Sequence, residues 1–381
     1  MAFGMLKNYS DKMVDNLERG RNNKIVKIFI LFFIIAISCL VLNYHSDTYI
    51  LEFFPNSYKS IFSQDLKQGN LIPPSLSTND SNISWKKSSR PENYLTSKKK
   101  NQNKLKKVLK EAAMADKTVI ITALNAAWTA PNSIFEIFLE SFVIGNNTKP
   151  LLKNLLVVAL DQTAYSHCLK IHTHCYALIT KNVDFSGEKL YMSGDYLKMM
   201  WRRTDFLRVV LQMGYNFIFT DADILWFRQP FAHFYSNVDF QIACDHYLHD
   251  SFDPNNDPNG GFKFVKSNNQ TIQFYKFWYK SRKIYKGKNE QDVFNIIKYG
   301  PFIKKIGLKI RFLDTAYFGG FCEPSKDLNY VCTMHANCCV GLDNKIHDLR
   351  MTIDDWKNYM TLPSSEKGST RHTWTVPRIC G

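Results

Sequence analysis

From Thr118 onward, short apolar runs alternate with segments of helical periodicity, a pattern that excludes most fold classes. Residues 133–144 and 195–213 have the spacing of amphipathic helices, and Gly214 follows the second at the position where a left-handed residue often ends a helix. The apolar runs are predicted to be buried strands, at 118–124, 155–160, 175–179, 216–220 and 241–244. Strands that alternate with helices predict an α/β domain with a mostly parallel central sheet.

A second kind of apolar segment lies near the N-terminus. Residues 28–42 carry no charge, and Ile25 and Val26 extend the segment past Lys27 to about the length of a membrane span. Basic residues precede it and no small-residue cleavage site follows, which favours a signal-anchor over the alternative of a cleaved signal peptide. The prediction is a cytoplasmic tail, a transmembrane signal-anchor, a stem and a lumenal domain, at 1–24, 25–42, 43–116 and 117–381.

The cysteines agree with a lumenal domain. Eight of the nine follow the predicted span, an even number that is typical of disulfide bonding in an oxidising compartment. Short separations favour pairing of Cys168 with Cys175, and of Cys322 with Cys332, Cys338 or Cys339. A zinc site made by Cys168, Cys175 and the histidines between them is disfavoured, because the spacing differs from that of common zinc sites.

Charge alone suggests an anionic partner, since 49 Lys and Arg residues outnumber 34 Asp and Glu residues, for a formal net charge of +15. The densest basic run, 98–110, has no aromatic residue that could stack on a base. We therefore interpret it as a solvated stalk or helix face, with a polyanion contact as the alternative, and expect no nucleic-acid partner.

The predicted strand at 216–220 leads directly into two carboxylates, Asp221 and Asp223, separated by the small Ala222. Residues two apart in an extended chain lie on the same side. Ligands of open α/β sheets bind at the carboxyl ends of strands, and two carboxylates suit Mg2+ or Mn2+ with a phosphate ligand. The alternative is that both acids cap the next helix, near residues 229–231.

Several motifs together resemble the nucleotide-diphospho-sugar transferase domain of plant glycosyltransferase family 77. The resemblance covers roughly 118–359 and implies a GT-A (Rossmann-like) fold, a nucleotide-sugar donor, Mn2+ or Mg2+, retention of anomeric configuration, and a type II Golgi membrane protein that acts on cell-wall polysaccharides or glycoproteins. The motifs are TALNAAW at 122–128, VALD at 158–161, LKMMWRR at 197–203, FTDADILWF at 219–227, PNGGF at 258–262 and DTAYFGGFC at 314–322.

The resemblance also implies roles for individual residues. Asp223 becomes the direct metal ligand, Asp221 a ligand that also touches the donor ribose, and His335 the third ligand, although it could equally be a core histidine. Segment 289–295 is similar to a D-Q-D-x-x-N motif, with Glu290 replacing the first acid. Retention then implies a front-face substitution, with Gln291 or Asp292 on the opposite face of the sugar.

Further residues are predicted to bind the nucleotide sugar. Lys198 and Arg203, on the helix before the metal strand, are candidates for phosphate contact, with a solvated helix face as the alternative for either. Arg203 is favoured over Arg202 because adjacent helical residues cannot both face the site. Asn259 with Gly260 and Gly261 would let the backbone approach the sugar, unless they form a plain turn. The remaining candidates follow strands: Thr122 and Asn125 for the uridine, and Asp161 and Asp245 for sugar hydroxyls or loop capping.

Two other functions are compatible with parts of the pattern. In a haloacid-dehalogenase-type phosphatase, Asp221 would be the nucleophile and Asp223 the acid or base, but Ile224 replaces the expected Thr or Val. The lysine and acids that such an enzyme also needs could come only from 304–305 and 354–355. A non-catalytic lumenal binding protein is the other alternative, and the two exposed carboxylates argue against it.

Overall fold

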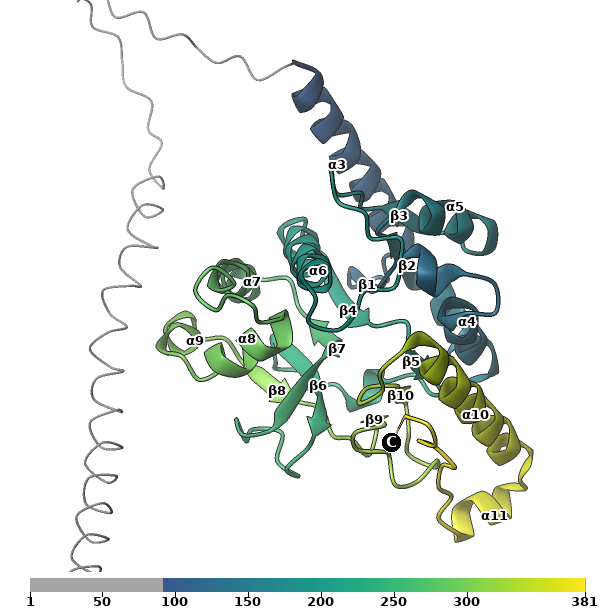
Figure 1. The fold of residues 1–381 in the computed structure, drawn as a ribbon. Helices are drawn as coiled ribbons and strands as arrows, with labels where there is room; N and C mark the ends of the chain where they lie inside the picture. The colour runs from purple at the N-terminus through teal and green to yellow at the C-terminus, as the bar shows by residue number, and fades with distance from the viewer. Residues whose placement is uncertain (1–91, 381) are drawn as a thin grey trace, which may run out of the picture. The chain divides into compact units, whose positions relative to one another are not determined.

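The computed structural model describes residues 92–380 (Figure 1). The predicted cytoplasmic tail, signal-anchor and most of the stem lie outside the described residues. Within 92–380, no helix has both the length and the apolar character that crossing a bilayer requires. The first described helix, α3 (Glu92–Ala112), has exposed lysines but buries Leu105 and Leu109 against the domain. The folded unit therefore begins before the predicted boundary at residue 117.

A seven-stranded sheet forms the centre of the domain, in the order β3-β2-β1-β4-β7-β6-β8. Neighbouring strands pair in parallel except where β7 meets β4 and β6, so the predicted mostly parallel sheet is confirmed. The strand bounds are β1 Thr118–Leu124, β2 Leu155–Ala159, β3 Cys175–Ala177, β4 Asn216–Thr220, β6 Phe240–His246, β7 Asp257–Val265 and β8 Ile310–Phe312.

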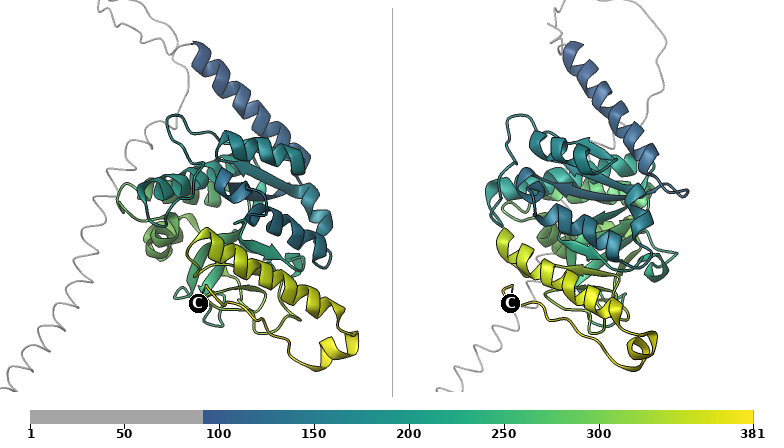
Figure 2. Two further views of the ribbon diagram at one scale, coloured as in Figure 1. Left: turned by 45° about the vertical axis from the view of Figure 1, so that its right-hand side comes forward. Right: turned by 90° about the vertical axis from the view of Figure 1, so that its right-hand side faces the viewer.

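Helices cover both faces of this sheet (Figures 1 and 2). Alternate residues of β4 show the division, because Ile218 belongs to the core cluster with α4 and α10, whereas Phe217 packs edge-on against Tyr275 of α7. The predicted helices at 133–144 and 195–213 are confirmed, and Gly214 has a positive φ of 83°. The helices after α3 are α4 Ile134–Ile144, α5 Gln162–Ile171, α6 Gly194–Gln212, α7 Asn269–Ser281, α8 Glu290–Ile297, α9 Pro301–Ile306, α10 Leu342–Thr361 and α11 Ser364–Ser369.

A second, three-stranded sheet joins distant parts of the chain. It consists of β5 (Ile224–Trp226), β10 (Thr333–His335) and β9 (Phe318–Gly320), in that order. In the antiparallel pair of β5 and β10, His335 lies opposite Ile224, and Ala336 N–H donates to the carbonyl of Asp223. This register places His335 beside the acidic pair.

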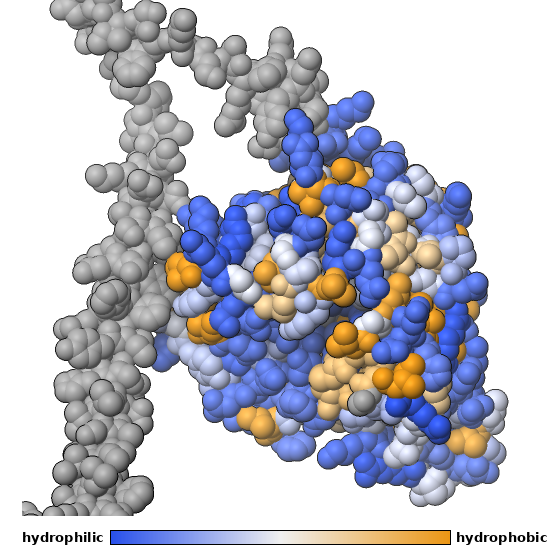
Figure 3. All heavy atoms as spheres, in the orientation of Figure 1, coloured by the Kyte–Doolittle hydropathy of each residue, from blue (hydrophilic) through white to orange (hydrophobic). Residues whose placement is uncertain are grey.

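Disulfide bonds join Cys168 to Cys175, Cys322 to Cys338 and Cys339 to Cys380. The first pair is as predicted, and Cys338 is the partner of Cys322 among the three candidates. Because Cys168 and Cys175 are bonded to each other, neither thiolate is available to zinc. The face of the described domain that is seen in Figure 3 is mostly hydrophilic, with separate hydrophobic groups.

Candidate active site

A cleft of about 470 Å³ opens at the carboxyl ends of the central strands. Its walls come from the end of β4, the start of α8, the end of β10 and the first turns of α10. The polar side chains that line it include Arg203, Asp221, Asp223, Asp245, His335 and Lys345. Such a volume and such convergent polar groups are typical of a small-molecule site.

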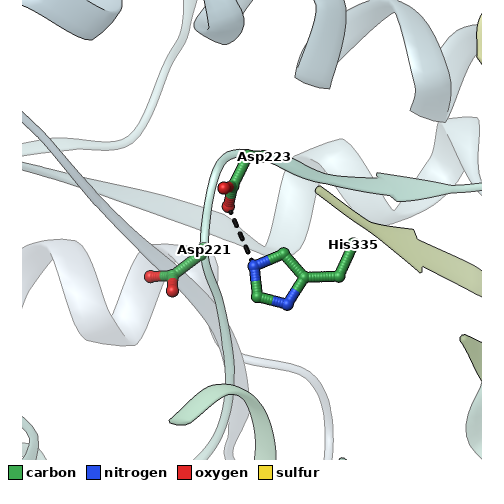
Figure 4. A group of neighbouring side chains, drawn as sticks. All are labelled: Asp221, Asp223 and His335. Carbon is green, nitrogen blue, oxygen red and sulfur yellow. Dashed lines mark ion pairs between the residues drawn. The ribbon is translucent and has the colours of Figure 1, made fainter. Parts of the chain in front are cut away.

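Asp221, Asp223 and His335 form a cluster in this cleft (Figure 4). One ligand atom from each residue lies within 4.8 Å of the other two. The segment that carries the acids is fixed by its backbone, since Asp221 N–H donates to the carbonyl of Gly261 over 2.8 Å. The arrangement brings His335, which is distant in sequence, together with Asp221 and Asp223, the other two predicted metal ligands.

Asp223 has the more enclosed carboxylate of the two. Its Oδ2 atom lies 2.7 Å from Nζ of Lys345, and its Oδ1 atom lies 3.3 Å from Nε2 of His335. Burial by itself would raise the pKa of Asp223, but Lys345 and His335 outweigh burial and hold that pKa below its ordinary value. The carboxylate is therefore ionised at neutral pH, while Oδ1 is buried without a hydrogen-bond partner.

Arg203 connects Asp221 to α8. Its guanidinium is buried and bonds both Oδ1 of Asp221 and Oε1 of Glu290. Burial would lower the pKa of Arg203, but the two carboxylates outweigh it and raise that pKa. Arg203 engages only Oδ1, which leaves the second oxygen of Asp221 for a ligand. As predicted, Arg203 rather than Arg202 faces the site. One terminal guanidinium nitrogen of Arg202 lies 3.7 Å from Oδ2 of Asp205 instead.

Two glycines permit the close packing around the cluster. A Cβ atom on Gly261 would lie 2.6 Å from Cε1 of His335 and 2.9 Å from Oδ2 of Asp221. Gly260 N–H donates to Oε1 of Gln291 over 2.8 Å, so backbone here approaches side chains of the cleft. The predicted close approach at these glycines thus occurs between parts of the protein itself.

Some predicted residues lie elsewhere. Lys198 is exposed and pairs with Asp195 over 3.0 Å. It is five residues from Arg203, which corresponds to about 140° around a helix, so the two side chains point in different directions. Thr122 is fully buried within β1, and Asp292 is absent from the residues that line the cleft.

Asp161 and Asn125 have local structural partners. Asp161 caps α5 by accepting from Ala164 N–H, and it also accepts from Ala126 N–H. This is the capping role that the sequence left open. Asn125 lines the cleft, but its side chain accepts from Trp128 N–H and donates to the carbonyl of Gly187. The Asn125 side chain thereby positions neighbouring loops.

Lys345 and Asn337 are among the cleft residues that sequence reasoning missed. Lys345, in the first turns of α10, bonds Asp223, and Asn337 bonds Asp245. Asn337 is two residues from His335, a spacing that could have indicated it. Lys345 has no local signal, because its proximity to Asp223 depends on the path of α10. The residues that a phosphatase would need, at 304–305 and 354–355, lie in α9 and α10 and do not line the cleft.

Comparisons with known proteins identify the family of this chain. A family model described as nucleotide-diphospho-sugar transferase matches residues 150–349. The Arabidopsis thaliana protein At4g15970, an uncharacterized protein, is 55% identical over 278 residues, which cover 73% of each chain. Arabinosyltransferase RRA1 of Arabidopsis thaliana is 32% identical over 113 residues, which cover 26% of this chain and 27% of that protein. The UDP-galactose:fucoside alpha-3-galactosyltransferase of Dictyostelium discoideum is 42% identical over 71 residues, covering 17% and 10% of the two chains.

The cleft lies at the carboxyl edge of an α/β sheet and contains two carboxylates and a histidine. Together with the family match, this places the chain in the glycosyltransferase class. The chain belongs to the nucleotide-diphospho-sugar transferase family. It is therefore a transferase, as the sequence predicted, and its relatives include plant arabinosyltransferases.

Proposed function

We propose that this chain is a metal-dependent, retaining glycosyltransferase that moves a sugar from a UDP-sugar to a cell-wall polysaccharide or a glycoprotein. The observation that carries the proposal is the cluster of Asp221, Asp223 and His335 inside the cleft. The family supplies the class of reaction. The cluster supplies ligands for the cation that a leaving diphosphate needs.

The donor set fits Mn2+ or Mg2+. Carboxylate oxygens are preferred by both ions, and an imidazole nitrogen favours Mn2+ of the two. The buried Oδ1 of Asp223 has only a 3.3 Å contact with Nε2 of His335, without hydrogen-bond geometry, so it retains the capacity to bind a cation. When bound, the cation would act as a Lewis acid that stabilises negative charge on the departing diphosphate.

The protein's own groups support the same step. Lys345 lies in the cleft beside Asp223, where its ammonium can meet a phosphate oxygen. Arg203 is engaged by Asp221 and Glu290, so it orients the acids rather than acting as an unpaired cation. A fixed cation such as Lys345 can stabilise the transition state without having to reorganise.

For retention, we propose a front-face substitution. The acceptor oxygen forms a bond to the anomeric carbon as the bond from that carbon to the diphosphate oxygen breaks, and the acceptor proton passes to the departing phosphate. Gln291 lines the cleft, which supports its placement against the opposite face of the sugar. Its amide is not a strong nucleophile, which suits a substitution without a covalent glycosyl-enzyme. Asp292 lies outside the cleft lining, so Gln291 is the better candidate of the two. Trapping a covalent glycosyl-enzyme would contradict this step.

The donor sugar and the location of the protein are also proposals. Arabinose, xylose and galactose are the candidate sugars, and an arabinosyltransferase and a galactosyltransferase among the relatives support pentose and hexose alike. A type II orientation in the Golgi membrane is supported by the apolar segment at 25–42 and by the three disulfide bonds of the described domain.

The full-length chain should be incubated with UDP-arabinofuranose, UDP-xylose and UDP-galactose, each with Mn2+, Mg2+ or EDTA. We expect one UDP-sugar to be hydrolysed, and only when metal is present. Titration calorimetry should show UDP binding that requires Mn2+. Binding without hydrolysis or transfer would favour the non-catalytic alternative, and phosphate release from phosphomonoesters would favour the phosphatase.

Asp223→Ala tests the site itself. This variant should lose metal-dependent UDP binding, whereas the matched variant Asp195→Ala, at an exposed acid of α6, should keep it. Thermal unfolding of both variants controls for folding. Normal turnover by Asp223→Ala would refute the assignment of the metal site.

A further inference from the structure

The carboxylate of Asp245, at the end of β6, accepts hydrogen bonds from three side-chain amides of the cleft. Its Oδ1 atom accepts from Nδ2 of Asn259 over 2.8 Å and from Nδ2 of Asn337 over 2.6 Å. Its Oδ2 atom accepts from Nε2 of Gln291 over 3.0 Å. The three amides come from β7, from the segment after β10 and from α8, so one anion connects three separate parts of the chain.

Each of these amides is also held at its oxygen by a backbone N–H group. Gly260 donates to Gln291 over 2.8 Å. Gly261 donates to Asn259 over 2.7 Å, and Cys322 donates to Asn337 over 3.2 Å. An amide held in this way cannot rotate by half a turn, because its NH2 group would then face the backbone N–H as a second donor. Asp245 and the backbone together fix the orientation of all three amides.

The connected segments are those that carry the candidate active site. Gly261 lies against Asp221 and His335, and Asn337 follows His335 by two residues. Gln291 lines the cleft next to Glu290, which bonds Arg203. A shift of Asp245 would therefore be felt first at the amides and above all at Gln291, the only one of the three amides that is bonded to Oδ2.

We propose that Asp245 is a positioning residue, which fixes the Gln291 amide toward the donor sugar by accepting a hydrogen bond from one of its two N–H groups. The second N–H of the same NH2 group is then directed away from Asp245 and can meet a sugar oxygen. This inference rests on the proposed function, because it assumes that the donor sugar lies beside Gln291. It differs from the sequence prediction, in which Asp245 itself bound sugar hydroxyls.

The hydrogen-bond pattern predicts that an effect on stability reverses in sign between two backgrounds. In Asp245→Asn, the new side chain has one oxygen and one NH2 group. The oxygen remains with Asn259 and Asn337, so the NH2 group faces the NH2 group of Gln291. Gln291→Glu resolves that conflict, since one glutamate oxygen accepts from Gly260 N–H and the other accepts from the new NH2 group. Alone, however, Gln291→Glu would place two carboxylates together.

The test compares the wild-type chain, Asp245→Asn, Gln291→Glu and the double variant at full length. The readouts are kcat for hydrolysis of whichever of the three UDP-sugars the wild type hydrolyses fastest, the Kd of UDP with Mn2+, and the midpoint of thermal unfolding. We expect Asp245→Asn to lower kcat by about 100-fold in the wild-type background, as misplaced groups do, and not to lower it further in the Gln291→Glu background, where the glutamate side chain has no N–H to offer the sugar. The Kd of UDP should change by no more than about twofold, because Asp245 makes no hydrogen bond to the metal cluster.

An equal loss of kcat in both backgrounds would overturn the inference, and so would an unchanged kcat in Asp245→Asn or a Kd that worsens in parallel with kcat. If the wild type fails to bind UDP with Mn2+, the proposed function is contradicted instead. The unfolding midpoint then still decides the arrangement of the amides. Asp245→Asn should lower the midpoint in the wild-type background and raise it in the Gln291→Glu background, and any other result contradicts the pattern.

Discussion

Nζ of Lys345 lies 2.7 Å from Oδ2 of Asp223, although the two residues are 122 positions apart in sequence. The same ammonium donates to the carbonyl of Ala336, the residue after His335. Lys345 thus joins the first turns of α10 to two segments of the metal cluster. It is a fixed cation next to the atoms that would hold the metal and the diphosphate.

Replacing this cation should weaken nucleotide binding. Lys345→Met removes a charged hydrogen-bond donor, a loss of about 1.5–3 kcal/mol for bonds to charged groups, so the Kd of UDP with Mn2+ should rise by about 10- to 100-fold. Titration calorimetry measures the change. Lys198→Met is the matched control, because Lys198 is exposed and paired with Asp195. Equal losses in both variants would mean that Lys198 also contacts the phosphate.

Gly261 should not tolerate a side chain. In Gly261→Ala the new Cβ would lie 2.6 Å from Cε1 of His335 and 2.9 Å from Oδ2 of Asp221, so at least one of the proposed metal ligands must move. We expect the affinity for Mn2+, measured by titration in the presence of UDP, to fall at least about tenfold, with a stability loss of about 1–3 kcal/mol from overpacking. Gly368→Ala is the control, since no atom lies within 4 Å of its new Cβ. Unchanged Mn2+ affinity in Gly261→Ala would contradict the close packing.

Local patterns were sufficient to predict much of the fold and part of the site. Apolar runs predicted β1, β2, β3, β4 and part of β6, but not β7 or β8 of the central sheet. The strand before Asp221 predicted the place of the acidic pair, because that depends on neighbouring residues. The adjacency of Arg202 and Arg203 correctly required that only one face the site. The short separation of Cys168 and Cys175 likewise predicted their disulfide bond.

Other parts of the site depend on contacts between distant segments. His335 reaches Asp223 through the antiparallel pairing of β5 with β10, and a sequence alone does not give that register. The helix that carries Lys198 was placed correctly beside the cleft. The direction of the Lys198 side chain around that helix was not, so its assignment to the cleft was wrong. The three amides around Asp245 come from separate segments, so no spacing in the sequence indicates that they meet.

Asp348 should anchor the C-terminal segment. Its buried carboxylate accepts from the backbone N–H groups of Arg378, Ile379 and Cys380. Asp348→Asn keeps the shape but removes the charge, so we expect a loss of about 1–3 kcal/mol in the free energy of unfolding from the weakened bonds. Denaturant unfolding measures it, and Asp354→Asn, at an exposed acid of the same helix, is the control. Identical stability of the two variants would contradict the anchor.

The same residue predicts a dependence on acid. Burial would raise the pKa of Asp348, but the hydrogen bonds from His347 and the three backbone N–H groups outweigh burial and lower that pKa. A carboxyl group whose pKa is lower in the folded state stabilises the protein above its ordinary pKa, and this contribution disappears as the pH falls through the folded value. The stability difference between wild type and Asp348→Asn should therefore shrink in acid. A difference that stays constant down to about pH 2 would contradict this explanation.

Lys263 predicts a slope of the same sign at alkaline pH. Its Nζ atom is buried beside the rings of Phe219 and Trp278 and donates to the carbonyl of Gly260. Burial, and then the charge of Arg203, lower the pKa of Lys263 to about 7. Between that value and the ordinary lysine pKa, the unfolded chain binds more protons than the folded protein, so stability should rise with pH. In Lys263→Met, denaturant unfolding across this range should show a smaller rise, and equal slopes in the two proteins would mean that the buried ammonium keeps its ordinary pKa.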